Sequence, residues 1–483
     1  MTISFKLLTQ APKQSALFIL PIAINQSLQL PSYLSSDITK TIHALTNTSP
    51  FSNNYGYQVL YSPFSNYLNH LIINVTHLTD WHRIGGDIGH QLHTLYPKSV
   101  TIDLSVLSLS ETSIQALVEG IILGSYRFLD YKTNPSRLNK LTISIVNSQS
   151  SSTLQQAITT GERFGAATNR ARNWANMPSN DLNPDRFTAI AKQLLKSTSI
   201  QLSVIDHHKA KKLGMNGLIG VGQGSAIPPR LLVMKYNIKR GDRPIALVGK
   251  GVTFDTGGIS IKGSKGMSDM KADMSGAAAV LSAMITIDQF KPNVPILALI
   301  PLAENMPDGA AQRPGDVITA MNGKTIEIIN TDAEGRLILA DALCYAVKQK
   351  ASKIVDIATL TGACGVALGE LAMGLMTNND QEANTMKSAA EKTGERVWQL
   401  PLYDEYIDYL ESTVADIAHC SEGRYGGTCT AAKFLEQFVD DLPWIHLDIA
   451  SVMSQKKNKG THVKGMSGAG TRNLIQFILD QAY

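Results

Sequence analysis

Five apolar segments between residues 230 and 450 restrict the fold of the chain more than any other feature. They lack the period-two alternation of strands that face water on one side. Such runs are typical of strands buried on both faces of a largely parallel sheet. Helical patterns, such as residues 276–287 and 335–347, lie between them. The segments are R-L-L-V-M-K-Y (230–236), P-I-A-L-V-G (244–249), V-P-I-L-A-L-I-P (294–301), K-I-V-D-I-A-T-L (353–360) and W-I-H-L-D-I-A (444–450).

A second, shorter alternation of strand-like and helical patterns occupies residues 1–150 and predicts a small N-terminal α/β domain with an assembly or regulatory role. Polar residues 147–153 mark its end, and an Ala-, Gln- and Arg-rich pattern over 151–175 predicts a connecting helix. Residues 176–483 then form a larger C-terminal catalytic domain, a doubly wound, mainly parallel sheet with helices on both faces. A chain of 483 residues is long enough for two domains, since single cores stop growing near ~250–300 residues.

Composition indicates a soluble globular protein, with 43% hydrophobic and 17% charged residues. The net charge of +4 is mildly basic, but the chain has no run of five or six like charges, so nucleic-acid binding is not indicated. The apolar stretch Leu17–Ile24 contains Pro21 and is too short to span a membrane. The N-terminus does not have the pattern of a signal peptide. We therefore expect a cytoplasmic protein.

The cysteines agree with a reducing compartment, because none of them forms a C-x-x-C pair. The lone histidines, His419 and His446 among them, are more typical of packing or surface residues than of ligands. The four cysteines are Cys344, Cys364, Cys420 and Cys429.

Charged residues gather at the predicted ends of the strands. Lys250 follows the run P-I-A-L-V-G, with Asp255 and Lys262 further on in a glycine-rich stretch, and Asp273 precedes a helix of small residues. A lysine at a strand end commonly extends to water, and an aspartate before a helix is commonly a cap. Because ligands of open α/β sheets bind beyond the carboxyl ends of the strands, these residues are also candidates for one site.

The octapeptide N-T-D-A-E-G-R-L (330–337) adds three charges at alternate positions after the strand-like T-I-E-I-I. If the octapeptide is extended, Asp332, Glu334 and Arg336 point to the same side. A lone D-x-E-x-R is more often a solvated loop. Here it joins acids that follow other strands, which favours a common site.

Four carboxylates in one crevice need either raised pKa values or cations. Two carboxylates ~4 Å apart repel by about 4 kcal/mol at an effective dielectric constant near ~20. Two divalent ions balance the charge of Asp255, Asp273, Asp332 and Glu334. Oxygen ligands with one amine suit Mn²⁺, Mg²⁺ or Zn²⁺ rather than copper or a structural zinc site. Lys250 can be that amine only when it is deprotonated.

The motifs as a set resemble those of the leucyl aminopeptidase (cytosol aminopeptidase) family. The resemblance extends from about residue 170 to the C-terminus, with E-G-I-I-L-G-S-Y-R-F (119–128) in the first domain, whereas the first hundred or so residues match no motif. It rests on V-G-K-G-V-T-F-D-T-G-G-I-S-I-K (248–262), M-K-A-D-M-S-G-A-A-A-V (270–280), E-N-M-P-D-G-A-A-Q-R-P-G-D (304–316), the octapeptide, T-L-T-G-A (359–363) and R-Y-G-G (424–427).

This resemblance implies a site with two metal ions. One ion is expected on Lys250, Asp255, Asp273 and Glu334, and the other on Asp255, Asp332 and Glu334, so that Asp255 and Glu334 bridge. The main-chain carbonyl of Asp332 could add a ligand. Lys262 and Arg336 match catalytic positions. The positions near the bound amino acid are Met270, Asn330, Thr359, Leu360 and Gly362.

The implied reaction removes the N-terminal residue, preferably leucine or another apolar residue, from peptides with a free α-amine. Two ions (Mn²⁺ or Zn²⁺, with Mg²⁺ as an alternative in one site) activate a bridging water, Lys262 stabilises the oxyanion, and a bicarbonate on Arg336 shuttles the proton. The family implies a homohexamer. Departures from its usual residues occur at Gly263, Ser275, Ala469 and 451–460, and none is a metal position.

Other functions remain as alternatives. The family resemblance allows an additional DNA-binding or regulatory role, to which the net charge of +4 gives little support, and Cys-Gly dipeptidase activity. A catalytically silent homologue is disfavoured because every motif position for metal and catalysis is filled. A serine hydrolase is disfavoured because the sequence has no G-x-S-x-G motif.

Overall fold

The structure is a computed structural model that forms two compact units. The first consists of Met1–Ala166 and Lys456–Val463, and the second of Ala167–Gln455 and Lys464–Tyr483. The division falls within the helix α5 (Ser152–Asn176), where the sequence predicts a connecting helix over residues 151–175. Arg424 and the predicted boundary at residues 149–150 lie outside the described residues. The structure describes residues 2–482 except 13, 24–27, 29, 33, 47–55, 62–66, 76–79, 135–139, 149–150 and 424.

The first unit contains a six-stranded sheet in the order β1-β6-β5-β2-β4-β3. Its neighbouring strands are parallel except for β3 and β4, which are antiparallel. The late segment Lys456–Val463 belongs to this unit, and Gly460 N donates a hydrogen bond of 2.9 Å to Asp87 Oδ1. The elements are β1 (Thr2–Leu8), β2 (Ser15–Ile22), α1 (Ser36–Thr46), β3 (Gly56–Tyr61), β4 (Tyr67–Asn74), α3 (Trp81–Leu95), β5 (Val100–Asp103), α4 (Glu111–Gly124) and β6 (Lys140–Val146).

The second unit is built on the doubly wound, mainly parallel sheet that the apolar runs predict. Its order is β16-β15-β18-β14-β9-β11-β8-β7, with β10 paired to β11. The central strands β18, β14, β9 and β11 are parallel, and β8 is antiparallel to β11. The strands are β7 (Gln201–Ile205), β8 (Arg230–Tyr236), β9 (Ile245–Gly249), β10 (Gly251–Asp255), β11 (Ile296–Asn305), β14 (Lys353–Ala358), β15 (Met373–Thr377), β16 (Val397–Gln399) and β18 (Trp444–Asp448).

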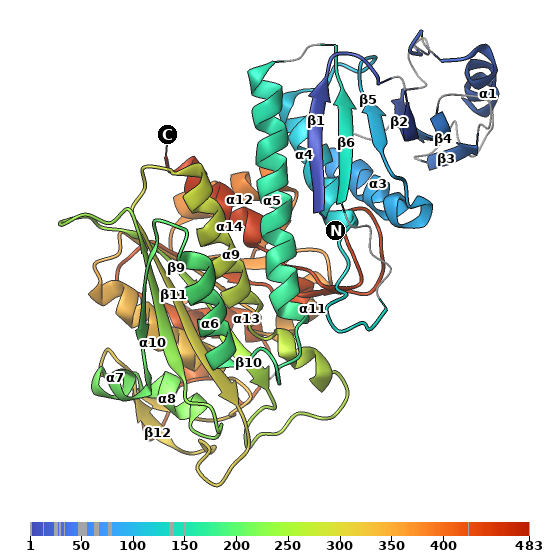
Figure 1. The fold of residues 1–483 in the computed structure, drawn as a ribbon. Helices are drawn as coiled ribbons and strands as arrows, with labels where there is room; N and C mark the ends of the chain where they lie inside the picture. Colours follow the sequence, from blue (N-terminus) through green and yellow to red (C-terminus); the bar gives the residue numbers. More distant parts are fainter. Residues whose placement is uncertain are drawn as a thin grey trace. The chain divides into compact units, whose positions relative to one another are not determined.

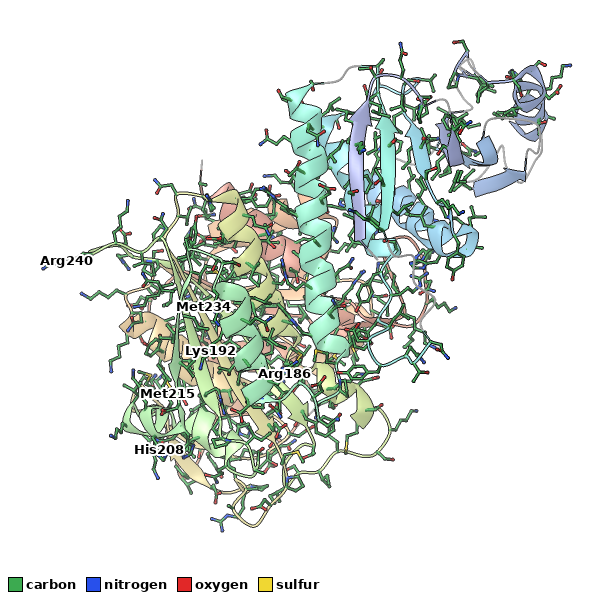
Figure 2. The ribbon with its side chains drawn as sticks, viewed as in Figure 1. Arg186, Lys192, His208, Met215, Met234 and Arg240 are labelled. Carbon is green, nitrogen blue, oxygen red and sulfur yellow. The ribbon has the colours of Figure 1, made fainter. Side chains whose placement is uncertain are left out.

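Helices cover the sheet, and α9 lies against β9 and β11 (Figure 1). Side chains fill the layers between them; Met234 of β8 is buried, whereas Arg240 beyond that strand is exposed (Figure 2). The helices are α6 (Pro184–Leu195), α7 (His207–Lys212), α8 (Asn216–Gly222), η1 (Met267–Ala272), α9 (Ser275–Phe290), α10 (Gly335–Lys348), α11 (Gly362–Leu368), α12 (Asp380–Thr393), η2 (Asp404–Leu410), α13 (Gly427–Glu436), η3 (Ala450–Val452) and α14 (Thr471–Asp480).

One helical stretch, Met267–Phe290, has the length and hydropathy of a membrane span, but 89% of an apolar 18-residue part of it is buried inside the protein. It therefore contributes to the core of the second unit. The same unit has two small sheets, and their strands are β12 (Val317–Thr319), β13 (Thr325–Glu327), β17 (Ile417–Ala418), β19 (Ser454–Gln455) and β20 (Gly465–Met466).

The strand-like run before the octapeptide lies in the small sheet β12-β13-β17 and not in the main sheet. The expectation that all four acids follow neighbouring strands of one sheet is therefore wrong for Asp332 and Glu334. These two residues reach the main sheet from a separate loop, which the small sheet supports.

Candidate metal centre

Lys250 occupies the turn between β9 and β10 and is only 3% exposed, so it does not extend to water. Its Nζ lies 2.8 Å from Asp273 Oδ1 and 2.8 Å from Glu334 Oε1. It also donates a hydrogen bond of 2.9 Å to the main-chain oxygen of Thr359, which follows β14. The buried amine therefore connects residues from three different parts of the chain.

Asp255 ends β10 and is 2% exposed. Its Oδ1 accepts hydrogen bonds from Gly257 N at 2.9 Å and from Asn305 Nδ2 at 2.8 Å. Its Oδ2 lies 2.7 Å from Lys262 Nζ, which also pairs with Asp332. Lys262 is therefore held between two of the predicted metal ligands.

Asp273 comes directly after η1, two residues before α9. It is not the helix cap, because the capping position is Met274, where no side chain caps the helix. Its Oδ1 instead accepts a hydrogen bond of 2.7 Å from Thr359 Oγ1. Gly276 permits this placement, since a Cβ there would lie 2.1 Å from Ile357 O. The absence of a side chain at Gly276 lets α9 approach β14 and brings Asp273 to Lys250.

The octapeptide is a turn followed by a helix, so an extended conformation over residues 331–336 is wrong. Ala333 N donates to Asn330 O at 3.0 Å, and α10 begins at Gly335. Glu334 has helical dihedral angles and is 2% exposed, whereas the side chain of Asp332 is 32% exposed. The turn therefore brings these acids to one site, and the alternation of side chains along a strand plays no part.

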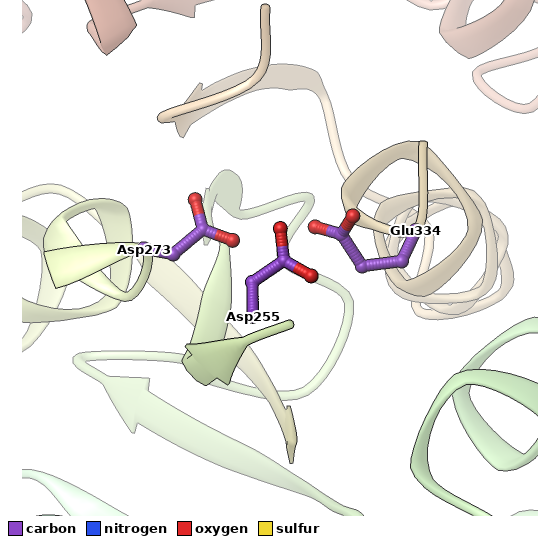
Figure 3. A group of neighbouring side chains, drawn as sticks. All are labelled: Asp255, Asp273 and Glu334. Atoms are coloured by element: carbon purple, nitrogen blue, oxygen red, sulfur yellow. The ribbon is translucent and has the colours of Figure 1, made fainter. Parts of the chain in front are cut away.

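Three carboxylates, those of Asp255, Asp273 and Glu334, each offer an oxygen within 4.8 Å of the others (Figure 3). Burial raises the pKa of both aspartates, and the negative charge of Glu334 raises it further, against the lowering effect of Lys250. Burial lowers the pKa of Lys250, but Asp273, Glu334 and Asp255 outweigh it and raise that pKa above its ordinary value. The cluster therefore favours bound positive charge.

The donor set fits divalent cations. Asp273 Oδ2 and Glu334 Oε1 are buried and accept no hydrogen bond within the described part of the chain, although each lies 2.8 Å from Lys250 Nζ. With Asp332, four carboxylates meet the two ammonium groups of Lys250 and Lys262, and this leaves two formal negative charges. Carboxylate oxygens are suitable ligands for Mn²⁺, Mg²⁺ or Zn²⁺, and Lys250 would join them as an amine once an ion displaced its proton.

Gly335 leaves room for the amine of Lys250. A Cβ at this position would lie 2.4 Å from Lys250 Cε and 2.7 Å from its Nζ. We expect Gly335→Ala to displace the amine and to lower kcat on the order of 100-fold, since misplacement by about 1 Å has that effect. Steady-state kinetics of the variant and of the unsubstituted protein measures the change. Gly309→Ala is the control, because a Cβ there meets nothing within 4 Å; equal activity of both variants would contradict the expectation.

The residues predicted near the substrate lie around the same cluster. Thr359 binds Asp273 directly, and Asp273 N donates to Met270 O at 3.2 Å. Asn330 belongs to the turn that carries Asp332, and its Oδ1 accepts from Asp332 N at 3.0 Å. Leu360 and Gly362 lie where β14 leads into α11. Their contact with a bound amino acid stays a prediction.

Several supporting residues were not found from the sequence. Asp448, at the end of β18, accepts hydrogen bonds from Leu360 N at 3.2 Å and from Thr361 Oγ1 at 2.6 Å. Asn305, at the end of β11, donates to Asp255. Both residues end strands of the structure, but the predicted runs end at residues 301 and 450, so Asn305 lay beyond one run and Asp448 lay inside the other. His419 contacts the octapeptide, and no local pattern indicates this.

Comparison with known proteins identifies the family. Residues 169–475 match the catalytic domain of the cytosol aminopeptidase family. The chain belongs to the cytosol aminopeptidase family. A probable cytosol aminopeptidase of Solibacter usitatus is 47% identical over 367 residues, 76% of each chain. Another, from Aquifex aeolicus, is 47% identical over 375 residues, 77% of this chain and 75% of the relative.

A solved structure agrees with this cytosol aminopeptidase over nearly its whole length. The bottromycin maturation enzyme BotP in complex with Mn has a TM-score of 0.84 and 30% identity, and the match covers 97% of this chain and 100% of that chain. The protein is therefore a metal-dependent aminopeptidase, a peptidase of the hydrolase class.

Proposed function

We propose that this aminopeptidase removes an apolar N-terminal residue, preferably leucine, from peptides with a free α-amine at a site for two divalent ions. The observation that carries the proposal is the cluster of buried carboxylates of Asp255, Asp273 and Glu334 around the amine of Lys250. Lys250, Asp255, Asp273 and Glu334 would hold one ion, and Asp255, Asp332 and Glu334 the other. When bound, such ions lower the pKa of a water and polarise a carbonyl oxygen.

Lys262 is suited to stabilise the oxyanion that forms at the scissile carbonyl. Burial lowers its pKa, but Asp255 and Glu334 outweigh burial and raise the pKa, so the side chain stays an ammonium group at neutral pH. The side chain is 21% exposed and therefore accessible to a substrate. A fixed donor aimed at developing negative charge is an effective catalytic device.

Arg336 is suited to hold a small planar anion such as bicarbonate. It lies in the first turn of α10, two residues after Glu334, and is 7% exposed. Its Nη1 donates to His419 O at 2.9 Å, whereas its buried Nε has no partner among the described residues. A planar guanidinium with an unused donor matches a carboxylate-like anion.

The dependence on a free α-amine tests the proposal most directly. We expect leucine p-nitroanilide to be hydrolysed and its N-acetyl derivative to react on the order of 1000-fold more slowly. Acetylation converts the α-amine of the substrate into an amide, whose nitrogen is a poor metal ligand, so the substrate no longer offers an amine to the site. Release of p-nitroaniline from both compounds measures this. Comparable rates would rule out an aminopeptidase site of this design.

We further propose Mn²⁺ or Zn²⁺ as the resident ions, with Mg²⁺ as an alternative in one site, and a homohexamer in the cytoplasm. The four cysteines are free and buried, as suits a reducing compartment. Large apolar side chains exposed on one subunit support assembly, among them Val366 and Leu371. Metal analysis and light scattering of the purified protein test these assignments.

A further inference from the structure

His419 forms several hydrogen bonds with residues 329–336, called the 329–336 loop, whereas a residue with only a packing role would form none that are specific to this loop. It follows β17, is fully buried, and its main-chain N donates to Glu327 O at 3.0 Å. Its ring accepts a hydrogen bond from Ile329 N at Nδ1, 3.2 Å away, and Nε2 lies 2.8 Å from Asn330 O. One side chain thus contacts the main-chain N–H of Ile329 and the main-chain oxygen of Asn330 at the start of the loop.

The same residue also binds the end of the loop. The main-chain oxygen of His419 accepts the 2.9 Å hydrogen bond from Arg336 Nη1. Between these two points, Asn330 O also accepts from Ala333 N, and Asn330 Oδ1 accepts from Asp332 N. His419 is therefore connected to Asp332 through Asn330 and to the helix that follows Glu334 through Arg336.

The contacts favour one form of the ring. Nδ1 lies 3.2 Å from both Ile329 N, which can only donate, and Glu327 O, which can only accept, whereas Nε2 lies 2.8 Å from Asn330 O. A neutral ring with its proton on Nε2 donates to Asn330 O and accepts from Ile329 N, whereas the other tautomer would set the lone pair of Nε2 against Asn330 O. Burial, with the charge of Arg336, lowers the pKa of His419 to about 3, which keeps the ring neutral and agrees with this assignment. The other fully buried histidine of this region, His446, instead pairs with Asp356 in the sheet, and this ring bond does not involve the loop.

We propose that His419 is a positioning residue that holds both ends of the 329–336 loop and so places Asp332 and Glu334 for metal binding, an inference that rests on their proposed role as ligands. Residues that orient metal ligands commonly affect metal affinity or activity by about 10- to 100-fold. Residues 329–334 of this loop belong to no helix or strand, so its shape depends on such contacts.

Three substitutions separate the two ring contacts. His419→Gln keeps a donor near the position of Nε2, His419→Asn keeps an acceptor near the position of Nδ1, and His419→Leu keeps neither. Ile417→Ala is the matched control, because Ile417 lies in β17 two residues before His419, is 4% exposed, and has an apolar side chain that packs in the core and cannot form the hydrogen bonds of His419. Thermal unfolding places all four variants on one scale of stability.

The first measurement is hydrogen–deuterium exchange of the loop amides in the metal-free chain. We expect the exchange of the Ile329 and Asp332 amides to become about 10-fold or more faster in His419→Leu, and to stay near wild type in Ile417→Ala. His419→Asn should protect Ile329 more than His419→Gln does, and this comparison decides the question if His419→Leu does not fold. Equal exchange in all variants would overturn the proposal.

The second measurement is Mn²⁺ affinity, with kcat and KM determined separately. We expect His419→Leu to weaken Mn²⁺ binding and to lower kcat about 10- to 100-fold with little change in KM, and His419→Gln to recover part of both. Losses that follow thermal stability equally in Ile417→Ala would show a merely structural role. Wild-type protein that binds no Mn²⁺ would refute the proposed metal site, whereas wild-type binding with unaffected variants would refute only the role of His419.

Discussion

Removal of divalent ions is expected to lower the rate of leucine p-nitroanilide hydrolysis by about 1000-fold or more. The reason is that without ions the acids of the cluster are paired with Lys250 and Lys262, and neither lysine can activate a water or polarise a carbonyl as a divalent ion does while it is protonated. Several kcal/mol of transition-state stabilisation would then be lost. The measurement compares activity before dialysis against a chelator, after it, and after addition of Mn²⁺ or Zn²⁺.

The fold itself should survive this treatment, because Lys250 and Lys262 remain paired with the acids. Far-ultraviolet circular dichroism of the dialysed protein is therefore the control. Full activity in a sample shown by elemental analysis to contain no metal would contradict the proposed chemistry. Activity that Mn²⁺ fails to restore in a folded sample would point to another ion, which a metal panel identifies.

Glu334→Gln is expected to reduce activity by about 1000-fold or more and to weaken Mn²⁺ binding on the order of 100-fold. Glu334 is 2% exposed, and its Oε1 lies 2.8 Å from Lys250 Nζ and close to Asp255 and Asp273. The amide keeps the shape of the side chain but removes the charge and one acceptor oxygen from both proposed ion sites. Because the site is buried, water does not compensate for the lost carboxylate charge of Glu334.

The matched control for this substitution is Glu304→Gln. Glu304 lies one residue before Asn305 at the end of β11, but its carboxylate accepts from Ser225 Oγ at 2.6 Å and is not part of the cluster. We expect its kinetics to stay close to wild type. A Glu334→Gln enzyme with normal turnover would remove this residue from the mechanism, whereas equal losses in both variants would indicate general damage to the fold.

The main sheet could be predicted because burial on both faces leaves a direct mark on the sequence. Each of the five apolar runs is a strand, and Lys250 and Asp255 follow from their place at the strand ends. The conformation of the octapeptide could not be predicted this way. Alternating charges suit both a strand and a turn, and the choice depends on contacts with His419, which is distant in sequence.

The supporting residues of the site were missed for a related reason. Asp448 holds Leu360 and Thr361 across 87 to 88 residues of chain, and Asn305 reaches Asp255 across 50. A polar residue at a strand end gives no local sign of its partner, so only the register of the strands shows the pairing. Asp273 was a clearer case, since the sequence predicts a helix of small residues after it, and the structure shows that Gly276 lets this helix approach β14.

The late segment Lys456–Val463, which completes the first unit, has a consequence for biosynthesis. A ribosome makes the chain from its N-terminus, so the partner of Asp87, Gly460, emerges only after the catalytic sheet has been translated. The first unit therefore cannot reach its final form as an independent early product. A fragment cut at Ala166 would lack this closing segment and leave the surface around Gly86 uncovered, since a Cβ there would lie 2.0 Å from the backbone of Gly460.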